Sequence, residues 1–118
     1  MITIYGIKNC DTVKKARRWL EANDVAFQFH DFRVEGLDEK TINSWLSSVS
    51  WEILLNKRGT TWRNLDDPRK DQLDQATAIE LMLKNPTLIK RPVLSNNSGC
   101  MVGFKEADYA AYFGNFGK

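Results

Sequence analysis

The stretch that decides the fold comes at the start of the chain, where residues 2–20 read ITIYGIKNCDTVKKARRWL. Residues 2–5 predict a short β-strand, residues 6–9 a turn, and residues 11–20 a helix with one apolar face. Cys10 therefore stands where a loop becomes the N-terminus of a helix, beside free backbone N–H groups and the positive end of the helix dipole. Both favour the thiolate, which is the nucleophilic form of cysteine. The opening stretch thus indicates cysteine chemistry.

The residues that follow extend this stretch to a βαβ unit. The predicted helix stops around Asn23 and Asp24, since these residue types tolerate a turn. Residues 25–32 alternate between apolar and polar side chains, which predicts a second strand. A strand, a helix and a strand within about 30 residues favour two parallel strands joined by a right-handed crossover.

The rest of the chain predicts a helical middle, a β-hairpin and a final helix. The middle comprises a helix over residues 37–49, a helical turn at 51–55, a structured loop at 56–63 and a helix over 68–84. A broken strand over residues 88–94, a hairpin turn at 95–99, a strand over 100–104 and an aromatic-rich helix over 107–116 follow. We expect an α/β protein with a thioredoxin-like fold, in which a four-stranded mixed sheet is flanked by helices and carries an inserted all-helical segment. Residues 1–118 form one domain, with the core in residues 1–35 and 87–118 and the helical insertion in residues 36–86.

Composition and charge are those of an ordinary globular domain. The chain has 118 residues, of which 42% are hydrophobic and 27% charged, with a net charge of +2. That charge is too small to predict nucleic-acid binding, although Lys14, Lys15, Arg17 and Arg18 form a basic run on the first helix, which is most often a solvated face. No apolar run is long enough to span a membrane, and two distant cysteines without an export signal predict a cytoplasmic protein with reduced thiols. No phosphate-binding glycine loop, metal-ligand cluster or dinucleotide fingerprint occurs, so we expect no bound cofactor.

Cys10 admits two interpretations. Most free cysteines are buried, small apolar residues, but a strand-to-helix corner flanked by Lys8, Asn9 and Asp11 favours a partly exposed, functional thiol. Val13 stands where a C-x-x-C motif would place its second cysteine. A disulfide at Cys10 therefore requires a distant cysteine or an outside thiol such as glutathione.

A few other residues could take part in the chemistry. Cys100, the other cysteine, fits a packed strand residue better than a resolving thiol. Arg91 and Pro92 open a predicted strand, where the peptide bond is either cis, presenting backbone groups to a ligand, or an ordinary edge-strand proline. Arg58 has a guanidinium suited to oxyanions, or is an exposed loop charge. His30 fits a structural or surface histidine better than a catalytic base.

Three stretches together resemble the ArsC family of arsenate reductases and their relatives, and in particular its YffB group. They are IYGIKNCDT at residues 4–12, RGTTWR at 58–63 and KRPVL at 90–94, and the resemblance extends over essentially the whole chain. It implies a thioredoxin-like fold with an inserted helical segment. In arsenate reductases of this family the cysteine attacks arsenate, three arginines hold the oxyanion, and glutathione and glutaredoxin release arsenite.

Carried over by motif, the resemblance implies a catalytic set and a binding set. The catalytic set is Cys10 as nucleophile with Arg58 and Arg91; the substrate- or glutathione-binding set is Lys8, Asn9, Asp11, Thr12, Arg91 and Pro92, the last as the presumed cis proline. The chain departs from the arsenate reductases in three places: MVGF at residues 101–104 lacks the third arginine, Gly6 replaces a histidine and Val13 replaces a serine.

These departures favour a thiol reductase over an efficient arsenate reductase, because each lost contact to a developing oxyanion costs about 2–4 kcal/mol of transition-state stabilisation. We expect glutathione, or another small thiol, as co-substrate and glutaredoxin as a possible protein partner. Two alternatives stay open at this point. One is an Spx-like regulator that binds the RNA polymerase α-subunit without turnover, and the other is a true arsenate reductase.

Overall fold

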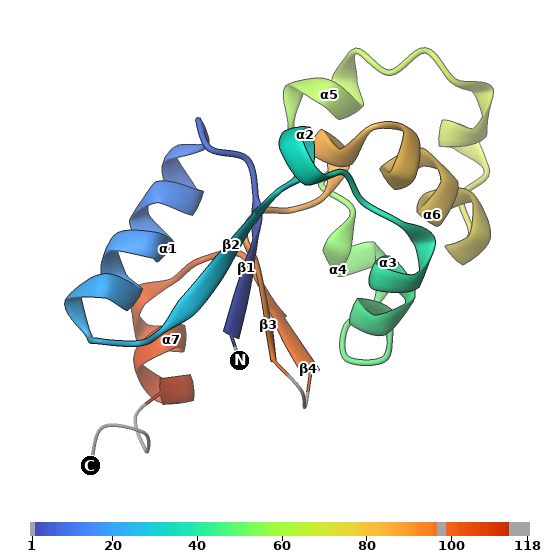
Figure 1. Ribbon diagram of the computed structural model, residues 1–118. Coiled ribbons are helices and arrows are strands. Elements are labelled where there is room, and N and C mark those ends of the chain that lie inside the picture. Colours follow the sequence, from blue (N-terminus) through green and yellow to red (C-terminus); the bar gives the residue numbers. More distant parts are fainter. Residues whose placement is uncertain (1, 97–98, 114–118) are drawn as a thin grey trace.

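A four-stranded mixed sheet runs through the centre of the molecule in the order β2-β1-β3-β4 (Figure 1). The computed structural model describes residues 2–96 and 99–113. Strand β1 (Ile2–Gly6) pairs in parallel with β2 (Phe27–Asp31) and antiparallel with β3 (Val93–Asn96), and β3 pairs antiparallel with β4 (Gly99–Val102). The predicted mixed sheet and the parallel βαβ unit are confirmed.

Helices cover both faces of this sheet. Helices α1 (Asp11–Ala22) and α7 (Glu106–Phe113) lie on one side of it, and the segments between β2 and β3 gather on the other (Figure 1). Those segments are α2 (Phe32–Glu35), α3 (Glu39–Leu46), α4 (Trp51–Leu54), α5 (Thr60–Arg63), η1 (Pro68–Asp71), α6 (Gln75–Lys84) and η2 (Pro86–Leu88). No helix in this described part of the chain has the length and apolarity needed to cross a bilayer.

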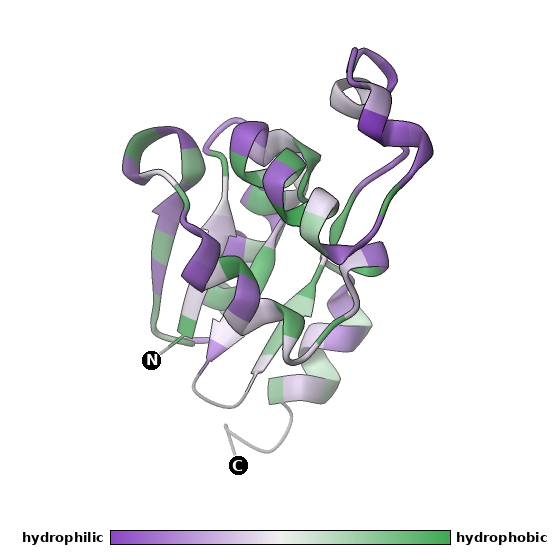
Figure 2. Cartoon of the chain, turned by 90° about the vertical axis from the view of Figure 1, so that its right-hand side faces the viewer, coloured by the Kyte–Doolittle hydropathy of each residue, from purple (hydrophilic) through white to green (hydrophobic). Residues whose placement is uncertain are grey.

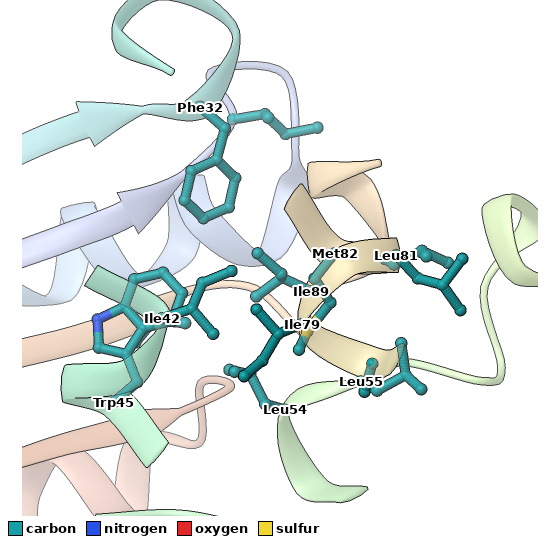
Figure 3. Close-up of a cluster of buried hydrophobic side chains, with 13 residues drawn as sticks. Phe32, Ile42, Trp45, Leu54, Leu55, Ile79, Leu81, Met82 and Ile89 are labelled. Atoms are coloured by element: carbon teal, nitrogen blue, oxygen red, sulfur yellow. The ribbon is translucent and has the colours of Figure 1, made fainter. Parts of the chain in front are cut away.

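The alternation of side chains along the strands separates two hydrophobic cores. Ile4 and Leu94 point to the α1 and α7 side, whereas Val93 packs with the insertion. Trp45 and Ile42 of α3 lie with Phe32, Leu54 and the α6 residues in this second core (Figure 3). In the view onto the insertion side, hydrophobic and hydrophilic residues alternate along most helices, as expected where each helix buries one face (Figure 2).

The strands differ from the sequence prediction mainly at their ends. The second strand ends at Asp31, because its carboxylate accepts the N–H of Arg33 at 2.8 Å and so caps α2, which was not predicted. The predicted broken strand over residues 88–94 becomes a strand only from Val93, since Pro92 has no N–H for the ladder and Ile89 pairs instead with Leu55 of the insertion.

The helical prediction was wrong at two places in the insertion. The helix expected over residues 68–84 is divided into η1 and α6, because Asp67 and Asp74 each cap a separate N-terminus through their carboxylates. The loop expected at residues 56–63 contains α5. The last helix begins at Glu106; the predicted hairpin residues Asn97 and Ser98, and residues 114–116 of the final helix, lie outside the described residues.

Candidate active site

Most of the predicted site residues lie at the end of the sheet where β1 and β2 end and β3 begins. Gly6 at the end of β1 is in register with Asp31 at the end of β2, and Tyr5 is in register with Val93 at the start of β3. Cys10 opens α1 immediately beyond this end, and Pro92 comes just before β3. Segments more than 80 residues apart in sequence, by subtraction of 10 from 92, therefore meet at one end of the sheet.

Cys10 is the N-cap residue of α1, as predicted. Its backbone is extended (φ −91°, ψ 124°), and its carbonyl accepts the first helical hydrogen bond from Lys14 N–H at 3.0 Å. The thiol is half-buried and free. Its side chain forms no capping hydrogen bond by strict geometry, but the first-turn N–H groups of Thr12 and Val13 lie where they favour a charged sulfur.

The surroundings of Cys10 favour the thiolate. Partial burial opposes the charge and is the largest single influence on the thiol. The backbone N–H of Val13, the guanidinium of Arg91 and the backbone N–H of Thr12 together outweigh it, so the pKa of Cys10 lies below its ordinary value. A lowered pKa increases the fraction of thiolate at a given pH, and the half-exposed position leaves this nucleophile open to a substrate.

Arg91 is held beside Cys10 by its own anchor in η2. Its Nη1 donates to the carbonyl of Thr87 at 2.9 Å, and Thr87 in turn shares a hydroxyl hydrogen bond of 2.9 Å with Thr61 of α5. Nε of Arg91 is buried without a hydrogen-bond partner in the described residues. The Arg91–Pro92 peptide bond is cis, and the Pro92 carbonyl accepts the N–H of Gly103 at 2.8 Å.

The Arg58 side chain makes no recorded contact with Cys10 or Arg91 within the described part of the chain. It is exposed, and its backbone N–H donates to Asn56 Oδ1 at 3.0 Å; in the part of the chain that the structure describes, its guanidinium takes part in no hydrogen bond or ion pair. The RGTTWR stretch is nevertheless tied to the Arg91 anchor through the Thr61–Thr87 contact. The proposed binding of an anion by the Arg58 guanidinium therefore stays a prediction.

The predicted binding residues around Cys10 form its exposed rim. Lys8, Asn9 and Asp11 are exposed, and Thr12 is half-buried. The Lys8 side chain is thus open to solvent, while its backbone N–H donates to Asp31 Oδ2 at 3.2 Å. The loop before Cys10 is fixed by its backbone, leaving the side chains of the rim for a ligand.

Asp31 is a positioning residue that the sequence analysis missed. It is the buried charged residue of the described chain, and its two carboxylate oxygens accept the N–H of Lys8 and the N–H of Arg33. One side chain thus ties the loop before Cys10 to the start of α2. An aspartate at a strand end, two residues before the N–H it caps, was the available signal.

Gly6 and Val13, the two departures near Cys10, are in contact with each other. A Cβ placed at Gly6 would lie 2.6 Å from Cγ2 of Val13, and Val13 is fully buried. A side chain at position 6 would therefore require Val13 or the backbone around it to shift. The two departures from the arsenate reductases thus occupy one packed contact between β1 and α1.

Cys100 is placed for packing. Burial raises its pKa to about 11, and its S–H donates to the Trp45 carbonyl at 3.6 Å. It is in register with Ser95, and Ser95 with Thr3, three residues before the end of β1. Cys10 and Cys100 are both free thiols in the structure, and they come from different elements, the N-terminus of α1 and strand β4.

The fold and the cysteine site define a thioredoxin-like protein with a single thiol at the N-terminus of α1, an arginine acting on that thiol, and a cis proline directly after this arginine. Within that class, the chain belongs to the ArsC family, whose model matches residues 5–112. The resemblance stated from the three sequence motifs is thereby confirmed.

The chain is similar over nearly its whole length to several individual proteins. A solved structure of a YffB protein shares 49% identity and a TM-score of 0.90, covering 94% of this chain and 97% of that one. An arsenate reductase (ArsC) related protein from Brucella melitensis shares 54% identity and a TM-score of 0.76, with 95% and 93% covered. The global transcriptional regulator Spx of Streptococcus mutans is 31% identical over 95% of this chain and 82% of its own length.

Proposed function

We propose that this protein is a glutathione-dependent thiol reductase in which Cys10 forms a mixed disulfide. The single observation that supports it most is the convergence of Arg91 and the first-turn N–H groups on the half-exposed Cys10 sulfur. Membership of the ArsC family and the similarity to an arsenate reductase related structure agree with reductase chemistry.

The proposed reaction removes glutathione from a glutathionylated thiol. The Cys10 thiolate attacks the glutathione sulfur of R–S–S–G, forming Cys10–S–S–G and releasing R–S⁻, which takes up a proton. A second glutathione, as thiolate, then attacks the mixed disulfide, and Cys10 leaves as thiolate while glutathione disulfide is formed. The net change is R–S–S–G plus GSH to R–SH plus GSSG, a thiol–disulfide exchange in which one glutathione thiol is consumed and the R sulfur returns to the thiol.

Each residue of the site has a part in this scheme. Arg91 would stabilise the Cys10 thiolate as attacking and as leaving group. Arg58 and the exposed rim would bind the glutathione carboxylates, and the backbone beside cis Pro92 would hold the tripeptide in an extended form. Cys100 takes no part in this scheme, because its thiol is half-buried with a raised pKa.

Two features disfavour arsenate as the natural substrate. The stretch after the hairpin carries no arginine, and at that place Gly103 is bound through its backbone to Pro92. The space at Gly6 is filled by Val13, so this chain cannot hold a second polar side chain there without repacking. An arsenate turnover assay with saturating glutathione and glutaredoxin tests this directly, and no turnover is expected.

The test of the proposal is intact-protein mass spectrometry after incubation with oxidised glutathione. Wild type and Cys100→Ser should each gain one glutathione, and Cys10→Ser should gain none. Reduced glutathione should then restore the original mass. A glutathione adduct on Cys10→Ser, or an internal disulfide lost in Cys100→Ser, would contradict the single-thiol scheme.

The second candidate function is an Spx-like regulator that binds RNA polymerase through its surface. The 31% identity to a global transcriptional regulator Spx over nearly the whole chain favours it. Val13 removes the C-x-x-C switch that such regulators commonly carry, so this protein would bind without that redox control. A pull-down with the RNA polymerase α-subunit in both redox states discriminates the two functions, and absence of binding in either state excludes the regulator.

A further inference from the structure

A stripe of positive charge leads away from Cys10 along the outer face of α1. Lys14, Lys15 and Arg18 are all exposed, and Arg18 lies four residues after Lys14 and three after Lys15, so its side chain neighbours both lysines on the helix surface. We call these three residues the basic stripe. Arg17 does not belong to it, because its guanidinium packs over the Phe29 ring at 4.2 Å.

The basic residues of α1 lie at positions where they are unfavourable for the helix. Cations are favourable at a helix C-terminus and unfavourable near its N-terminus, yet Lys14 and Lys15 follow closely on the first turn and the last turn has no basic residue. Lys14 and Arg18 are also a like-charge pair at i and i+4, which is mildly destabilising. Helix formation therefore does not explain the stripe.

The stripe has no task within the protein either. In residues 2–96 and 99–113, no ion pair involves Lys14, Lys15 or Arg18, whereas Arg69 in the insertion pairs with both Asp67 and Glu80. The cation that acts on Cys10 is Arg91. The flanking acids of α1 are Asp11 in the first turn and Glu21 in the last. By spacing, Asp11 neighbours Lys14 and Lys15, and Glu21 neighbours Arg18, so these two acids offset part of the charge and leave an excess of positive charge close to the nucleophile.

The position of the stripe indicates which partner would use it. Lys14 and Arg18 lie four and eight residues after Cys10, or about 6 and 12 Å along the helix axis. Anything bound there at the same time as a sulfur at Cys10 must carry negative charge about two to four extended residues from that sulfur. A polypeptide meets this requirement, whereas a nucleic acid offers no sulfur to the thiol.

We propose that the basic stripe of α1 is a docking surface for acidic segments of glutathionylated proteins, which it orients for transfer of glutathione to Cys10. This inference rests on the proposed function and adds the class of protein substrate. Glutathione itself would occupy the thiol and the Arg91 side, while the acidic segment flanking the modified cysteine would run along α1. Such contacts act mainly on the association rate and are screened by salt.

The test compares two short glutathionylated peptides that are identical except for two glutamates or two lysines placed three and four residues from the cysteine. The rate of glutathione transfer to Cys10 is followed by quenching and mass spectrometry at low ionic strength and at about 0.5 M salt. Wild type should prefer the glutamate peptide by about tenfold at low salt. High salt should remove the preference.

The decisive variant is Lys14→Glu/Lys15→Glu. It should fold about as well as wild type, because acids near the helix N-terminus and new pairs with Arg18 at i+4 and i+3 offset the new like-charge spacings to Asp11. It should lose or reverse the peptide preference while its rate with oxidised glutathione stays within about twofold. Lys40→Glu/Lys84→Glu, on α3 and α6 of the insertion, makes the same change in net charge and should keep the preference.

The outcomes separate the two proposals. Equal rates for both peptides, with normal glutathione transfer, would overturn the docking surface and leave the reductase proposal intact. Loss of preference in the Lys40→Glu/Lys84→Glu control would assign the effect to net charge and also overturn it. Absence of any transfer to Cys10 would overturn both. Binding of a labelled DNA duplex that depends on Lys14 and Lys15, with equal peptide rates, would assign the stripe to nucleic acid instead.

Discussion

Replacing Gly6 with alanine is expected to destabilise the protein through a single contact. The new Cβ would lie 2.6 Å from Cγ2 and 3.3 Å from Cγ1 of Val13, against about 3.5–4.0 Å for ordinary carbon contacts. Val13 is fully buried and cannot withdraw into solvent. Overpacking of this kind costs about 1–3 kcal/mol of unfolding free energy.

The same contact predicts a rescue by Val13→Ala. Alone, that change removes two buried methyl groups and should cost about 1.5–3 kcal/mol, including the cavity. Combined with Gly6→Ala, the new methyl group enters the space that valine vacated, so the double variant should be more stable than the sum of the single losses by about 1–2 kcal/mol. The unfolding free energies are measured by urea denaturation of all four proteins.

A second measurement links this packing to the thiol. The N–H of Val13 is among the groups that lower the pKa of Cys10, so a shift of the α1 backbone in Gly6→Ala should slow alkylation of Cys10 at neutral pH, and the double variant should recover. Gly59→Ala is the matched control, since its new Cβ would meet only the half-exposed Asn56 side chain, at 3.2 Å. Additivity of the two single losses within about 0.5 kcal/mol would refute the reasoning.

Three further predictions concern side chains. Arg91→Ala should raise the pKa of Cys10, because the variant loses the guanidinium that favours the thiolate while burial still opposes it. The pH–rate profile of Cys10 alkylation by iodoacetamide should then move to higher pH, with Arg91→Lys in between, and an unmoved profile would show that Arg91 does not act on the thiol. Asp31→Ala should lower the alkylation rate of Cys10 and cost about 1–3 kcal/mol of unfolding free energy, since two backbone donors lose their acceptor. Asp31→Asn keeps one acceptor oxygen and should restore part of both losses. Equal losses in the two variants would show that the acceptor oxygens of residue 31 do not contribute. The hydrogen bond from Arg69 lowers the pKa of Asp67 to about 2. The stability that Asp67 contributes is therefore present above about pH 4 and is lost as the pH falls toward 2. A difference in unfolding free energy between wild type and Asp67→Asn that stays constant over this pH range would contradict the prediction.

The parts of the fold that follow local patterns were predictable from the sequence. The alternation in residues 25–32 and the apolar face of residues 11–20 are local signals, and they gave the βαβ unit and the N-cap position of Cys10. The division of residues 68–84 was missed because aspartates at positions 67 and 74 cap through side-chain geometry, which apolar periodicity does not report.

The site was only partly predictable for a related reason. The motif at residues 90–94 identified Arg91, and the structure places it beside Cys10. Asp31 was missed because it positions the Cys10 loop by accepting a hydrogen bond from Lys8 N–H, 23 residues away in sequence. The local sequence around Asp31 does not indicate that this loop is its partner. The contact of Gly6 with Val13 is likewise visible only once strand and helix are docked.

The distribution of the site along the chain ties the chemistry of Cys10 to the completion of folding. The cysteine is synthesised tenth, but the guanidinium that favours its thiolate arrives 81 residues later, by subtraction of 10 from 91, and is placed only when β3 pairs with β1. On a ribosome, a chain that ends before β3 carries a thiol without this electrostatic support. The full reactivity of Cys10 thus requires β3 to be paired with β1, in addition to a formed helix α1.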